Sequence, residues 1–527
     1  MMRQDDDIGL SADTLAALRE FALEQGIEVG QDVRKEVQSA IEEAKGPNDE
    51  SFSFVFGDDT QIRLNGLRRD IGQTLNSTGL TLWRAGDFLS DFMYRNKQLF
   101  AGKRVLEFGS GLGLCGILAA KLGANVLITD GDDESMPVLI ENCKLNDLDP
   151  NTCCKQLLWG TELTKESKGT FDVIIGADII YEKEYVAPLF ASASHFLSHK
   201  PNHLFLLAYT KRNVSIDYVL DCARKEGVGV VPCLFSGSGH VYEFVRTLRK
   251  CIYGKVKHAV ELTLHPNGSG VFVRTNLEVA IKVMSKAIIE QGHLQENPMI
   301  ELATQQYLSN PGHPNVLPLL ECLHDPEFIY AVLPFCKGGE LFSLVESGGA
   351  MDEDECRHWF TQVLAGLSYL QHRLICHRDM SLENVLLDGP TSKIIDFGLC
   401  IGIPVDAHGM TYSLPPAGAV GKIFYMPPEI YRNKVPFNGF ASDIWSTGVM
   451  LFIMVTGAPP FERPDDVDPR FQMIATGRLN EMLDSWGMQR VSKGVRDLLN
   501  KMLIVHDPRK RLTVEQIAQH PWVTGGH

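Results

Sequence analysis

The sequence predicts an α/β domain followed by an α+β domain. The chain has 527 residues, which is more than one hydrophobic core usually serves. Between residues 104 and 131, an apolar run, a glycine-rich turn, a helical pattern and a second apolar run follow one another, as in a parallel sheet covered by helices. Between residues 252 and 284, two strand-like runs flank the turn N-G-S-G, which indicates an antiparallel hairpin at the start of the second domain.

The net charge and the cysteines limit the possible partners and the compartment. The formal net charge is −16 at pH 7, which argues against nucleic acid or an anionic membrane surface as the main partner. The twelve cysteines include no C-x-x-C pair, and the adjacent Cys153 and Cys154 are poorly placed for one structural bridge. We therefore expect a reduced, intracellular protein without a zinc site.

Neither a secretion signal nor a membrane span is expected from the sequence. The first ten residues, MMRQDDDIGL, are acidic and lack the hydrophobic region of a signal peptide. The longest apolar run, near Val449 to Val455, is much shorter than the roughly 20 residues of a membrane span. We therefore expect a cytoplasmic protein with no membrane partner, and the oligomeric state is not predicted.

The first residues are expected to form a separate helical segment. Residues 11–25, SADTLAALREFALEQ, place apolar side chains at helical spacing behind an N-cap candidate, Ser11 or Asp13. After a polar break, SFSFVF and TQIRLNG indicate two strands, and a further helix follows them. The predicted domains are a helical segment at 1–49, the α/β domain at 50–245 and the α+β domain at 246–527.

A glycine-rich turn between two strands forms the first candidate ligand site. The first strand ends at Glu107, the turn contains Gly109, Gly111 and Gly113, and the second strand ends at Asp130. Glycines let the backbone approach a ligand closely, and an acidic residue that ends the second strand can bind both ribose hydroxyls. The G-x-G-x-G pattern alone would fit a nicotinamide cofactor equally well.

Further stretches in one order carry a resemblance to a known family. They are VLEFGSG, the T-D-G that ends the second strand, QLLWG at 156–160 and FDVIIGADIIY at 171–181. With these stretches, the first half resembles the Rossmann-like, seven-stranded methyltransferases that use S-adenosylmethionine. More narrowly, the D-x-x-Y pattern at Asp178 and Tyr181 resembles the small protein-lysine methyltransferases.

The resemblance implies a role for each of these residues. It places the methionine and carboxylate groups of the cofactor near Glu107, Gly109 and Gly111, and the ribose on Asp130. It also implies residues that line the cofactor pocket and residues that meet the incoming lysine. These are Trp83, Trp159 and Ala177 for the pocket, with Asp178 at the lysine and Tyr181 along its channel.

The residue types suit methyl transfer to lysine. A lysine amine, with a pKa of about 10.4, attacks a sulfonium methyl only when it is neutral, so a desolvating aromatic channel helps. A carboxylate at the channel mouth recruits the ammonium form and orients it. Two alternatives stay open, because Asp178 could merely cap the next helix and the domain could merely bind its cofactor. Related folds also methylate small molecules.

The second candidate site lies between His377 and Gly398, HRDMSLENVLLDGPTSKIIDFG. Phosphoryl transfer from a nucleotide needs two carboxylates and an amide. This stretch supplies them as Asp379, Asp396 and Asn384. HRDxxxxN followed by DFG resembles the catalytic core of a protein kinase, and this resemblance implies a bilobal α+β domain. The resemblance implies that Asp379 orients the acceptor hydroxyl, while Asn384 and Asp396 hold Mg²⁺ on the phosphates of ATP.

The resemblance also implies two ion pairs. Lys282, in the A-I-K that ends a strand, fits the lysine that holds the α- and β-phosphates. Glu301 fits its partner, with Glu296 as the alternative. Glu429, in a P-P-E that resembles the end of an activation segment, would pair with Arg511.

Two other parts of the nucleotide site match the kinases less closely. Leu333 would be the gatekeeper, Leu386 would form the floor of the adenine pocket, and adenine would meet the carbonyl of Pro334 and the N–H of Cys336. The phosphate-covering loop G-x-G-x-x-G-x-V departs from the family pattern, because side chains replace its first two glycines and would crowd the phosphates. The loop aligns on Gly254 and Val256, which places Arg249 and Cys251 at the missing glycines.

A second departure concerns two residues near the catalytic carboxylate. Serine/threonine kinases carry a lysine two residues after the catalytic Asp and a threonine in the G-T that precedes the A-P-E. Here the first position is Ser381 and the second is Lys422. We hypothesise that Lys422 reaches over Asp379 to supply the charge near the transferred phosphate, while Ser381 makes the crosswise hydrogen bond. The alternative is that Lys422 is a solvated charge facing the substrate.

The preferred hypothesis is a bifunctional enzyme that modifies proteins. Its second half would be a serine/threonine kinase, since tyrosine kinases resemble A-A-R-x-N where this chain has SLEN. The alternative is an active methyltransferase regulated or recruited by a nucleotide-binding scaffold. Protein substrates are expected for both halves, and neither substrate can be identified. HVYEFVRTLRK at 240–250 fits either the last strand of the first domain or the first strand of the second.

Overall fold

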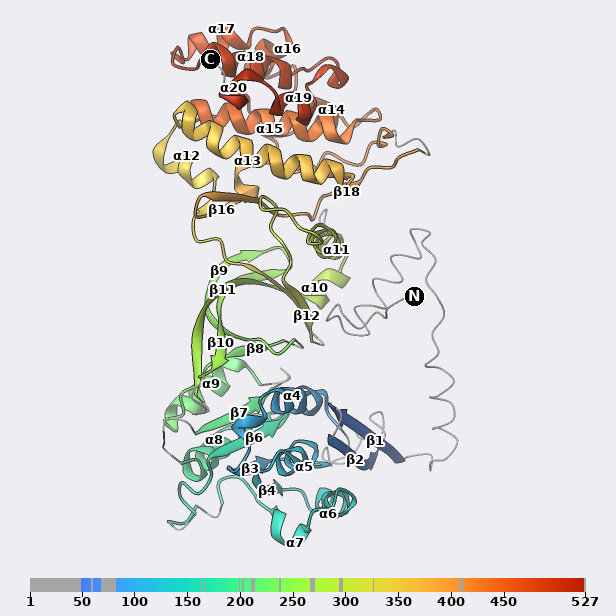
Figure 1. Cartoon of the computed structure of the whole chain (residues 1–527), viewed down its shortest axis with the longest axis vertical. Helices are drawn as coiled ribbons and strands as arrows, with labels where there is room; N and C mark the ends of the chain where they lie inside the picture. The colour runs from blue at the N-terminus through green and yellow to red at the C-terminus, as the bar shows by residue number, and fades with distance from the viewer. Residues whose placement is uncertain are drawn as a thin grey trace. The chain divides into compact units, whose positions relative to one another are not determined.

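The computed structural model of the protein describes residues 49–525, except for 58–59, 68–81, 162, 166, 199, 201–202, 210–213, 237, 266–270, 293–296, 326 and 407–410. The expected helix at 11–25, the N-G-S-G turn and Glu296 lie outside the described residues. The chain forms two compact units (Figure 1). One contains Val245–Ala259 and Glu278–His527, and the other contains the preceding residues together with Val260–Leu277, so the chain passes between the units more than once.

The first unit along the chain is built on a parallel sheet of five strands, which confirms the α/β prediction. Its strand order is β5-β4-β3-β6-β7, so the order reverses between β3 and β6. Ligands of open α/β sheets bind at such a reversal, beyond the carboxyl ends of the strands. The strands are β3 (Arg104–Phe108), β4 (Asn125–Asp130), β5 (Cys154–Gln156), β6 (Val173–Ala177) and β7 (Leu204–Ala208).

Helices and a hairpin complete this unit (Figure 1). Helix α5 packs on the sheet through Ile117 and Leu118, which are fully buried together with Val105 and Ile128 of the strands. The two expected strands pair antiparallel as β1 (Asp49–Phe56) and β2 (Thr60–Leu67). The helices are α4 (Arg84–Arg95), α5 (Leu114–Lys121), α6 (Ser135–Leu145), α7 (Pro150–Cys153), α8 (Lys183–Phe196) and α9 (Ile216–Lys225), with a 3₁₀ turn η2 (Lys97–Leu99).

A sheet of six strands in the order β12-β13-β11-β10-β9-β8 follows along the chain. The ambiguous HVYEFVRTLRK segment forms most of β9, which lies between β8 and β10 in this sheet. It is therefore the first long strand of the second sheet. The bounds are β8 (Cys233–Phe235), β9 (Val241–Cys251), β10 (Gly254–Leu264), β11 (Phe272–Ser285), β12 (Glu321–His324) and β13 (Phe328–Pro334), with α10 (Lys286–Glu290) and α11 (Pro298–Leu308) after β11.

The last part of the chain is helical and packs around α15 (Gly439–Thr456), where Trp445 and Phe452 are fully buried. Among the described helices, α15 alone is long and apolar enough to cross a membrane, and 89% of its apolar window is buried inside the protein. Helix α13 lies beside α15 (Figure 1). The other helices are α12 (Phe342–Gly348), α13 (Glu353–His372), α14 (Pro428–Arg432), α16 (Pro469–Ala475), α17 (Leu479–Ser485), α18 (Lys493–Met502), α19 (Val514–Ala518), α20 (Pro521–Thr524) and the 3₁₀ turn η4 (Pro508–Lys510).

Short strands hold the second candidate site on this helical core. The predicted hairpin is present as β16 (Val385–Asp388) and β17 (Thr391–Ile394), which pair antiparallel across a turn at Gly389 and Pro390. The pair is extended by β14 (Gly339–Glu340). The remaining elements are β15 (Ile375–Cys376), β18 (Ile401–Gly402) and the 3₁₀ turn η3 (Leu382–Asn384).

Candidate active sites

The loop that carries Asp379 is tied to the buried helix α15. Asp443 of α15 is 1% exposed and accepts the backbone N–H groups of His377 at 2.7 Å and Arg378 at 2.9 Å. The His377 ring lies 3.0 Å from the carbonyl of Ile395. A buried carboxylate that accepts two N–H groups fixes the backbone it holds. The loop is therefore held in place by the protein core.

The Asp379 carboxylate is enclosed by three polar groups. Asn384 donates to Asp379 Oδ2 at 2.7 Å, and the Lys422 backbone N–H donates to Oδ1 at 2.9 Å. The Lys422 ammonium lies 2.8 Å from Asp379 Oδ2 and 3.0 Å from Ser381 Oγ. The structure thus places Lys422 over Asp379, as hypothesised. Ser381 accepts a hydrogen bond from Lys422, whereas a crosswise bond from Ser381 to Asp379 was expected.

The implied ion pair between Lys282 and Glu301 is present. Lys282 Nζ on β11 lies 2.6 Å from both carboxylate oxygens of Glu301 on α11. Burial alone would lower the pKa of Lys282, but the carboxylates of Glu301 and Asp396 outweigh it, so this pKa is raised. Lys282 therefore stays charged, as a phosphate-binding lysine must.

The two residues that would hold Mg²⁺ are brought together by a backbone hydrogen bond. The N–H of Ile395, which directly precedes Asp396, donates to the carbonyl of Asn384 at 2.9 Å. The Asn384 side-chain nitrogen already donates to Asp379, so its amide oxygen is the atom left for a cation. Asp396 has a left-handed backbone, with φ of 69°, which is uncommon outside glycine and is found at functional sites. A carboxylate and an amide oxygen are ligands that suit Mg²⁺.

The residues expected around adenine also lie together. Leu333, Cys336 and Leu386 pack in one apolar cluster with Leu317 and Ile395. Pro334 is the last residue of β13, and its register partner is Val279 of β11. The structure thus brings together the apolar residues expected around adenine.

The segment that aligns with the phosphate-covering loop is a tight turn. Ile252 and Tyr253 connect β9 to β10, and Tyr253 is 3% exposed and packs in an apolar cluster. A Cβ at Gly254 would lie 2.2 Å from the carbonyl oxygen of Val283, so this close approach requires glycine. Val256 follows on β10. The turn is anchored by a buried tyrosine.

Arg249, which replaces the first glycine of the phosphate-covering loop, contacts a residue outside that loop. Arg249 Nη1 lies 3.1 Å from Glu340 Oε1 on β14, with both side chains partly exposed. An exposed pair of this kind contributes at most about 1 kcal/mol. The departure at Arg249 therefore adds a weak tether at the nucleotide site, and we assign it no chemical role.

The second implied ion pair is present and deeply buried. Arg511 makes two hydrogen bonds to Glu429, at 2.6 and 2.9 Å, and its side chain is 0% exposed. The guanidinium also lies over the Trp445 ring, 4.9 Å from its centroid. This pair fixes the end of the activation segment to the helical core.

The cradle expected to hold the cofactor lies in the α/β unit where β3 and β4 end. Asp130 Oδ2 accepts the Gly111 N–H at 2.8 Å, so the carboxylate holds the glycine-rich turn in place. Gly109, Gly111 and Gly113 have positive φ angles of 56°, 50° and 90°. A Cβ at Gly109 would lie 2.7 Å from the side chain of Ile179. The turn therefore requires glycine for its backbone conformation.

Two buried polar atoms in this cradle have no hydrogen-bond partner among the described residues. They are Glu107 Oε2 and Ser110 Oγ. Burial raises the pKa of Glu107 well above its ordinary value. Such orphaned atoms are costly unless a ligand satisfies them, so they fit the amine and carboxylate of an amino-acid-like cofactor. Trp83 precedes α4, and Trp159 lies in ring contact with Phe108.

The residues expected at the acceptor lysine follow β6. Asp178 is 8% exposed and has a left-handed backbone with φ of 58°, directly after Ala177 at the end of β6. The N-cap of α8 is Glu182, so the alternative that Asp178 merely caps this helix is wrong. Burial is the main cause that raises the pKa of Tyr181, whose ring lies 5.7 Å from that of Tyr185.

Several features of these sites were not predicted from the sequence. Ser110 lies inside the G-S-G turn that was analysed only for its glycines. Gly421 has φ of 93°, and a Cβ there would lie 2.7 Å from the Arg378 carbonyl, so this glycine lets Lys422 reach Asp379. The G-K dipeptide itself was the available signal. A cluster formed by Cys143 with Cys153 and Cys154 was also missed, because a helix brings Cys143 to the other two.

Comparisons with known proteins match each half separately. Residues 269–523 match the protein kinase domain family, and residues 68–222 match a family described as lysine methyltransferase. Serine/threonine-protein kinase SAPK1 of Oryza sativa subsp. japonica is 35% identical over 254 residues, which are 47% of this chain and 69% of that protein. The abscisic acid-inducible protein kinase of Triticum aestivum is 35% identical over 255 residues, which are 47% of this chain and 71% of that protein.

Proposed function

Because this chain belongs to the serine/threonine protein kinases and also contains a lysine methyltransferase domain, we propose that it phosphorylates protein serine or threonine with Mg²⁺ and ATP and methylates protein lysine with S-adenosylmethionine. Both domain types act on proteins, so the substrates are proteins. We also propose a cytoplasmic location, supported by the net charge of −16.

The observation that carries the kinase proposal is the enclosed Asp379 carboxylate. Asn384 and Lys422 hold it in one orientation, and the ion pair of Lys282 with Glu301 is also present. In the transfer, Asp379 would orient the acceptor hydroxyl and take its proton, and Lys282 would hold the α- and β-phosphates. Bound Mg²⁺ would supply charge compensation on the phosphates, held by Asn384 and Asp396.

The methyltransferase proposal is supported by the cradle at the ends of β3 and β4. Its unpaired Glu107 and Ser110 atoms suit the methionine part of the cofactor, and Asp130 suits the ribose. Asp178 would orient the lysine amine, and the ring of Tyr181 would exclude water from it. Bound S-adenosylmethionine would supply the methyl group.

One observation favours a second candidate for the kinase half. The loop expected to cover the phosphates is a tight turn anchored by Tyr253, which suits a nucleotide-binding scaffold that regulates the methyltransferase. The two candidates differ in whether phosphate is transferred.

The experiment incubates the purified full chain with labelled ATP and a mixed protein substrate, and separately with labelled S-adenosylmethionine. We expect transfer of both labels, located by mass spectrometry. Asp396→Asn should lower phosphate transfer at least about a thousandfold with an unchanged melting temperature. An exposed acidic residue, Asp466, provides the matched control Asp466→Asn. Nucleotide binding without transfer by the native protein would support the scaffold instead.

A further inference from the structure

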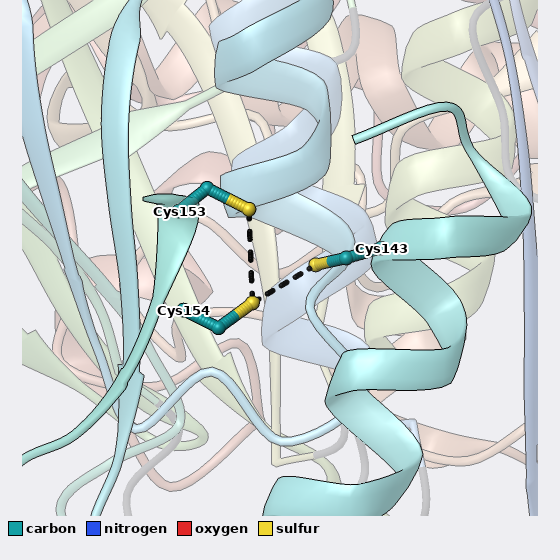
Figure 2. A group of neighbouring side chains, drawn as sticks. All are labelled: Cys143, Cys153 and Cys154. Carbon is teal, nitrogen blue, oxygen red and sulfur yellow. Dashed lines mark hydrogen bonds between the residues drawn. The ribbon is translucent and has the colours of Figure 1, made fainter. Parts of the chain in front are cut away.

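Three cysteine thiols converge in the α/β unit (Figure 2). Cys143 lies on α6, Cys153 is the last residue of α7, and Cys154 is the first residue of β5. The Cys143 and Cys154 sulfurs share a hydrogen bond at 3.3 Å, and the Cys153 and Cys154 sulfurs lie 3.7 Å apart. All three sulfurs lie within 4.8 Å of one another. We propose that this thiol cluster binds one soft d¹⁰ metal ion, Zn²⁺ or Cu⁺.

The spacing of the sulfurs suits a shared metal ion. Sulfurs bound to one zinc ion at about 2.3 Å lie about 3.8 Å apart in a tetrahedral site and about 4 Å apart in a trigonal one. The observed separations of 3.3 and 3.7 Å require only small shifts to reach these values. Thiolate sulfur selects Zn²⁺ and Cu⁺ over the hard cations. Three sulfurs complete a trigonal Cu⁺ site or leave the fourth zinc position to water.

A disulfide explains the cluster less well. All twelve cysteines of the chain are free thiols, and a disulfide would join only two of these three sulfurs. Cys153 and Cys154 are adjacent in the chain, which is a poor arrangement for a bridge. A metal ion uses all three sulfurs and needs no oxidant.

The burial of the thiols suits metal capture. A metal binds the thiolate form, so an ion that binds here displaces a proton from each thiol that ligates it. Cys143 is 0% and Cys153 is 8% exposed, while Cys154 is half-buried. An incoming ion can therefore reach Cys154 and would then be enclosed by the other two sulfurs.

The cluster lies beside the cofactor cradle of the same unit. Cys154 is the register partner of Ile128, and Gln156 is the register partner of Asp130. A metal ion bound by the thiols would link α6 to β5 at Cys154. This position lies two residues before Gln156, the residue that pairs with Asp130. Metal binding should therefore stabilise this edge of the sheet and the cradle with it.

The test measures metal binding by the reduced full-length protein after treatment with a chelator. One arm titrates with Zn²⁺ alone and a second, anaerobic arm with Cu⁺ alone. We expect one tightly bound ion per chain in one of the arms and a higher melting temperature in that arm. No ion retained in either arm would overturn the proposal, as would a Cys143–Cys154 disulfide in air-purified protein that takes up no metal after reduction.

Single substitutions locate the ion. Cys154→Ser should weaken binding at least about tenfold to a hundredfold, since loss of even an outer-shell partner costs that much. The half-buried position of Cys154 makes this change less disruptive than Cys143→Ser. Cys233→Ser is the matched control, because its thiol is exposed on β8 outside the cluster. Equal metal affinity in Cys154→Ser and the control would overturn the proposal.

A separate observation supports a second inference, which rests on the proposed kinase function. Lys422 and Ser381 stand where serine/threonine kinases carry a threonine and a lysine. The geometry points to Lys422 as a catalytic cation that replaces the missing lysine, with Ser381 as its positioning residue. Lys422 Nζ lies 2.8 Å from Asp379 Oδ2 and 3.0 Å from Ser381 Oγ, and Ser381 is fully buried.

The proposed step shows what the cation does. A bond forms between the acceptor oxygen and the γ-phosphorus, while the bond between that phosphorus and the β,γ-bridging oxygen breaks. The acceptor proton passes to Asp379, and ADP leaves with the electron pair of the broken bond. Negative charge on the transferred oxygens lies next to the acceptor and therefore close to Asp379. The Lys422 side chain, 34% exposed, meets this charge from above the carboxylate.

The test separates this inference from the function on which it rests. Lys422→Ala should lower kcat about 10²- to 10³-fold, with nucleotide affinity and melting temperature nearly unchanged. The exposed Lys434→Ala is the matched control. If the native protein transfers phosphate and Lys422→Ala transfers it equally fast, the assignment of Lys422 as a catalytic cation is overturned, while the proposed kinase function stands. No transfer by the native protein would overturn the proposed kinase function and this inference with it.

The reciprocal exchange tests the positioning role. Ser381→Lys combined with Lys422→Thr restores the arrangement of other serine/threonine kinases, and it should recover much of the rate that each single change loses. If the rate of the double variant is no higher than the native rate multiplied by the fractional rates of the two single variants, the two positions act independently.

Discussion

The two candidate sites treat their buried polar groups in opposite ways. In the kinase half, the protein itself pairs Asp379, Lys282 and Arg511 through short contacts of 2.6 to 2.9 Å. In the methyltransferase half, Glu107 Oε2 and Ser110 Oγ remain without a partner among the described residues. The charged groups Asp379, Lys282 and Arg511 of the first site are held by internal pairs, although Arg378 Nε has no partner among the described residues. In the second site, a buried carboxylate oxygen and a hydroxyl are themselves left for a ligand.

This difference indicates where each half is sensitive to change. Removing one partner of a buried pair leaves the other charge without compensation, so substitutions in the buried pairs Lys282–Glu301 and Arg511–Glu429 should cost folding stability. The methyltransferase cradle already has unpaired atoms, so substitutions there should act mainly on cofactor binding. The following predictions test this contrast, from the largest expected effect to the smallest.

The largest effect is expected at Arg511. Arg511→Ala removes the two hydrogen bonds that Arg511 donates to the Glu429 carboxylate, which is 9% exposed and keeps the bond from Ser442. The change also removes the contact with Trp445. We expect the free energy of unfolding of the kinase half to fall by about 3–5 kcal/mol. Denaturant unfolding followed by hydrogen exchange would measure it.

Arg509→Ala is the matched control for this change. Arg509 pairs with Asp507 two residues away, but its side chain is 84% exposed. Water screens an exposed pair, so removing Arg509 should change stability much less than removing Arg511. Equal losses for the two variants would show that the pairing of Arg511 does not hold the kinase half in shape.

The intermediate effect is expected at Asp130. The Asp130 carboxylate holds the glycine-rich turn through the Gly111 N–H and would also bind the ribose. Asp130→Ala should weaken S-adenosylmethionine binding about tenfold to a hundredfold, or about 1.4–2.7 kcal/mol. Asp178→Ala should retain binding and lose methyl transfer, because Asp178 would contact only the acceptor. Calorimetry with each variant checks the first change, and labelled methyl transfer checks the second. No loss of affinity in Asp130→Ala would remove Asp130 from the cofactor site.

Sequence patterns predicted the sites better than they predicted the supporting contacts. The pairs Lys282–Glu301 and Glu429–Arg511 could be predicted because each residue belongs to a short motif with fixed spacing. The burial of Ser110 could not be predicted from the sequence, and neither could the turn anchored by Tyr253, since both depend on how distant segments pack. Cys143 is brought to Cys154 by the ends of α6 and β5, and no spacing rule describes that approach.

The strand assignment shows a similar limit. HVYEFVRTLRK has a strand pattern that fits two domains equally well, and only its pairing with β8 and β10 decides the sheet. Strand propensity describes a residue's fit to a pleated surface and says nothing of which strand will be its neighbour.

The smallest effect is expected from the protonation of Glu107. Burial raises the pKa of this carboxyl well above its ordinary value, so the folded protein favours the neutral form. The stability from this group is fully present below the unfolded pKa of about 4.3 and is lost as the pH rises through the folded pKa. A cofactor with an ammonium group near Glu107 favours the ionised form instead. Binding should therefore release up to about one proton from Glu107, and the affinity should rise with pH.

Calorimetry in buffers of different ionisation enthalpy measures this proton release, because the observed heat then depends on the buffer. Glu107→Gln keeps the size and hydrogen-bonding shape of the side chain but cannot ionise. It should therefore reduce both the proton release and the pH dependence of affinity. Asp130, whose pKa is also raised by burial, is retained in both proteins and accounts for any remainder. Identical proton release in the native protein and Glu107→Gln would mean that the cofactor does not change the charge of Glu107. Ser110 alone would then distinguish the methyltransferase site, as a site with an atom left for a ligand, from the kinase site.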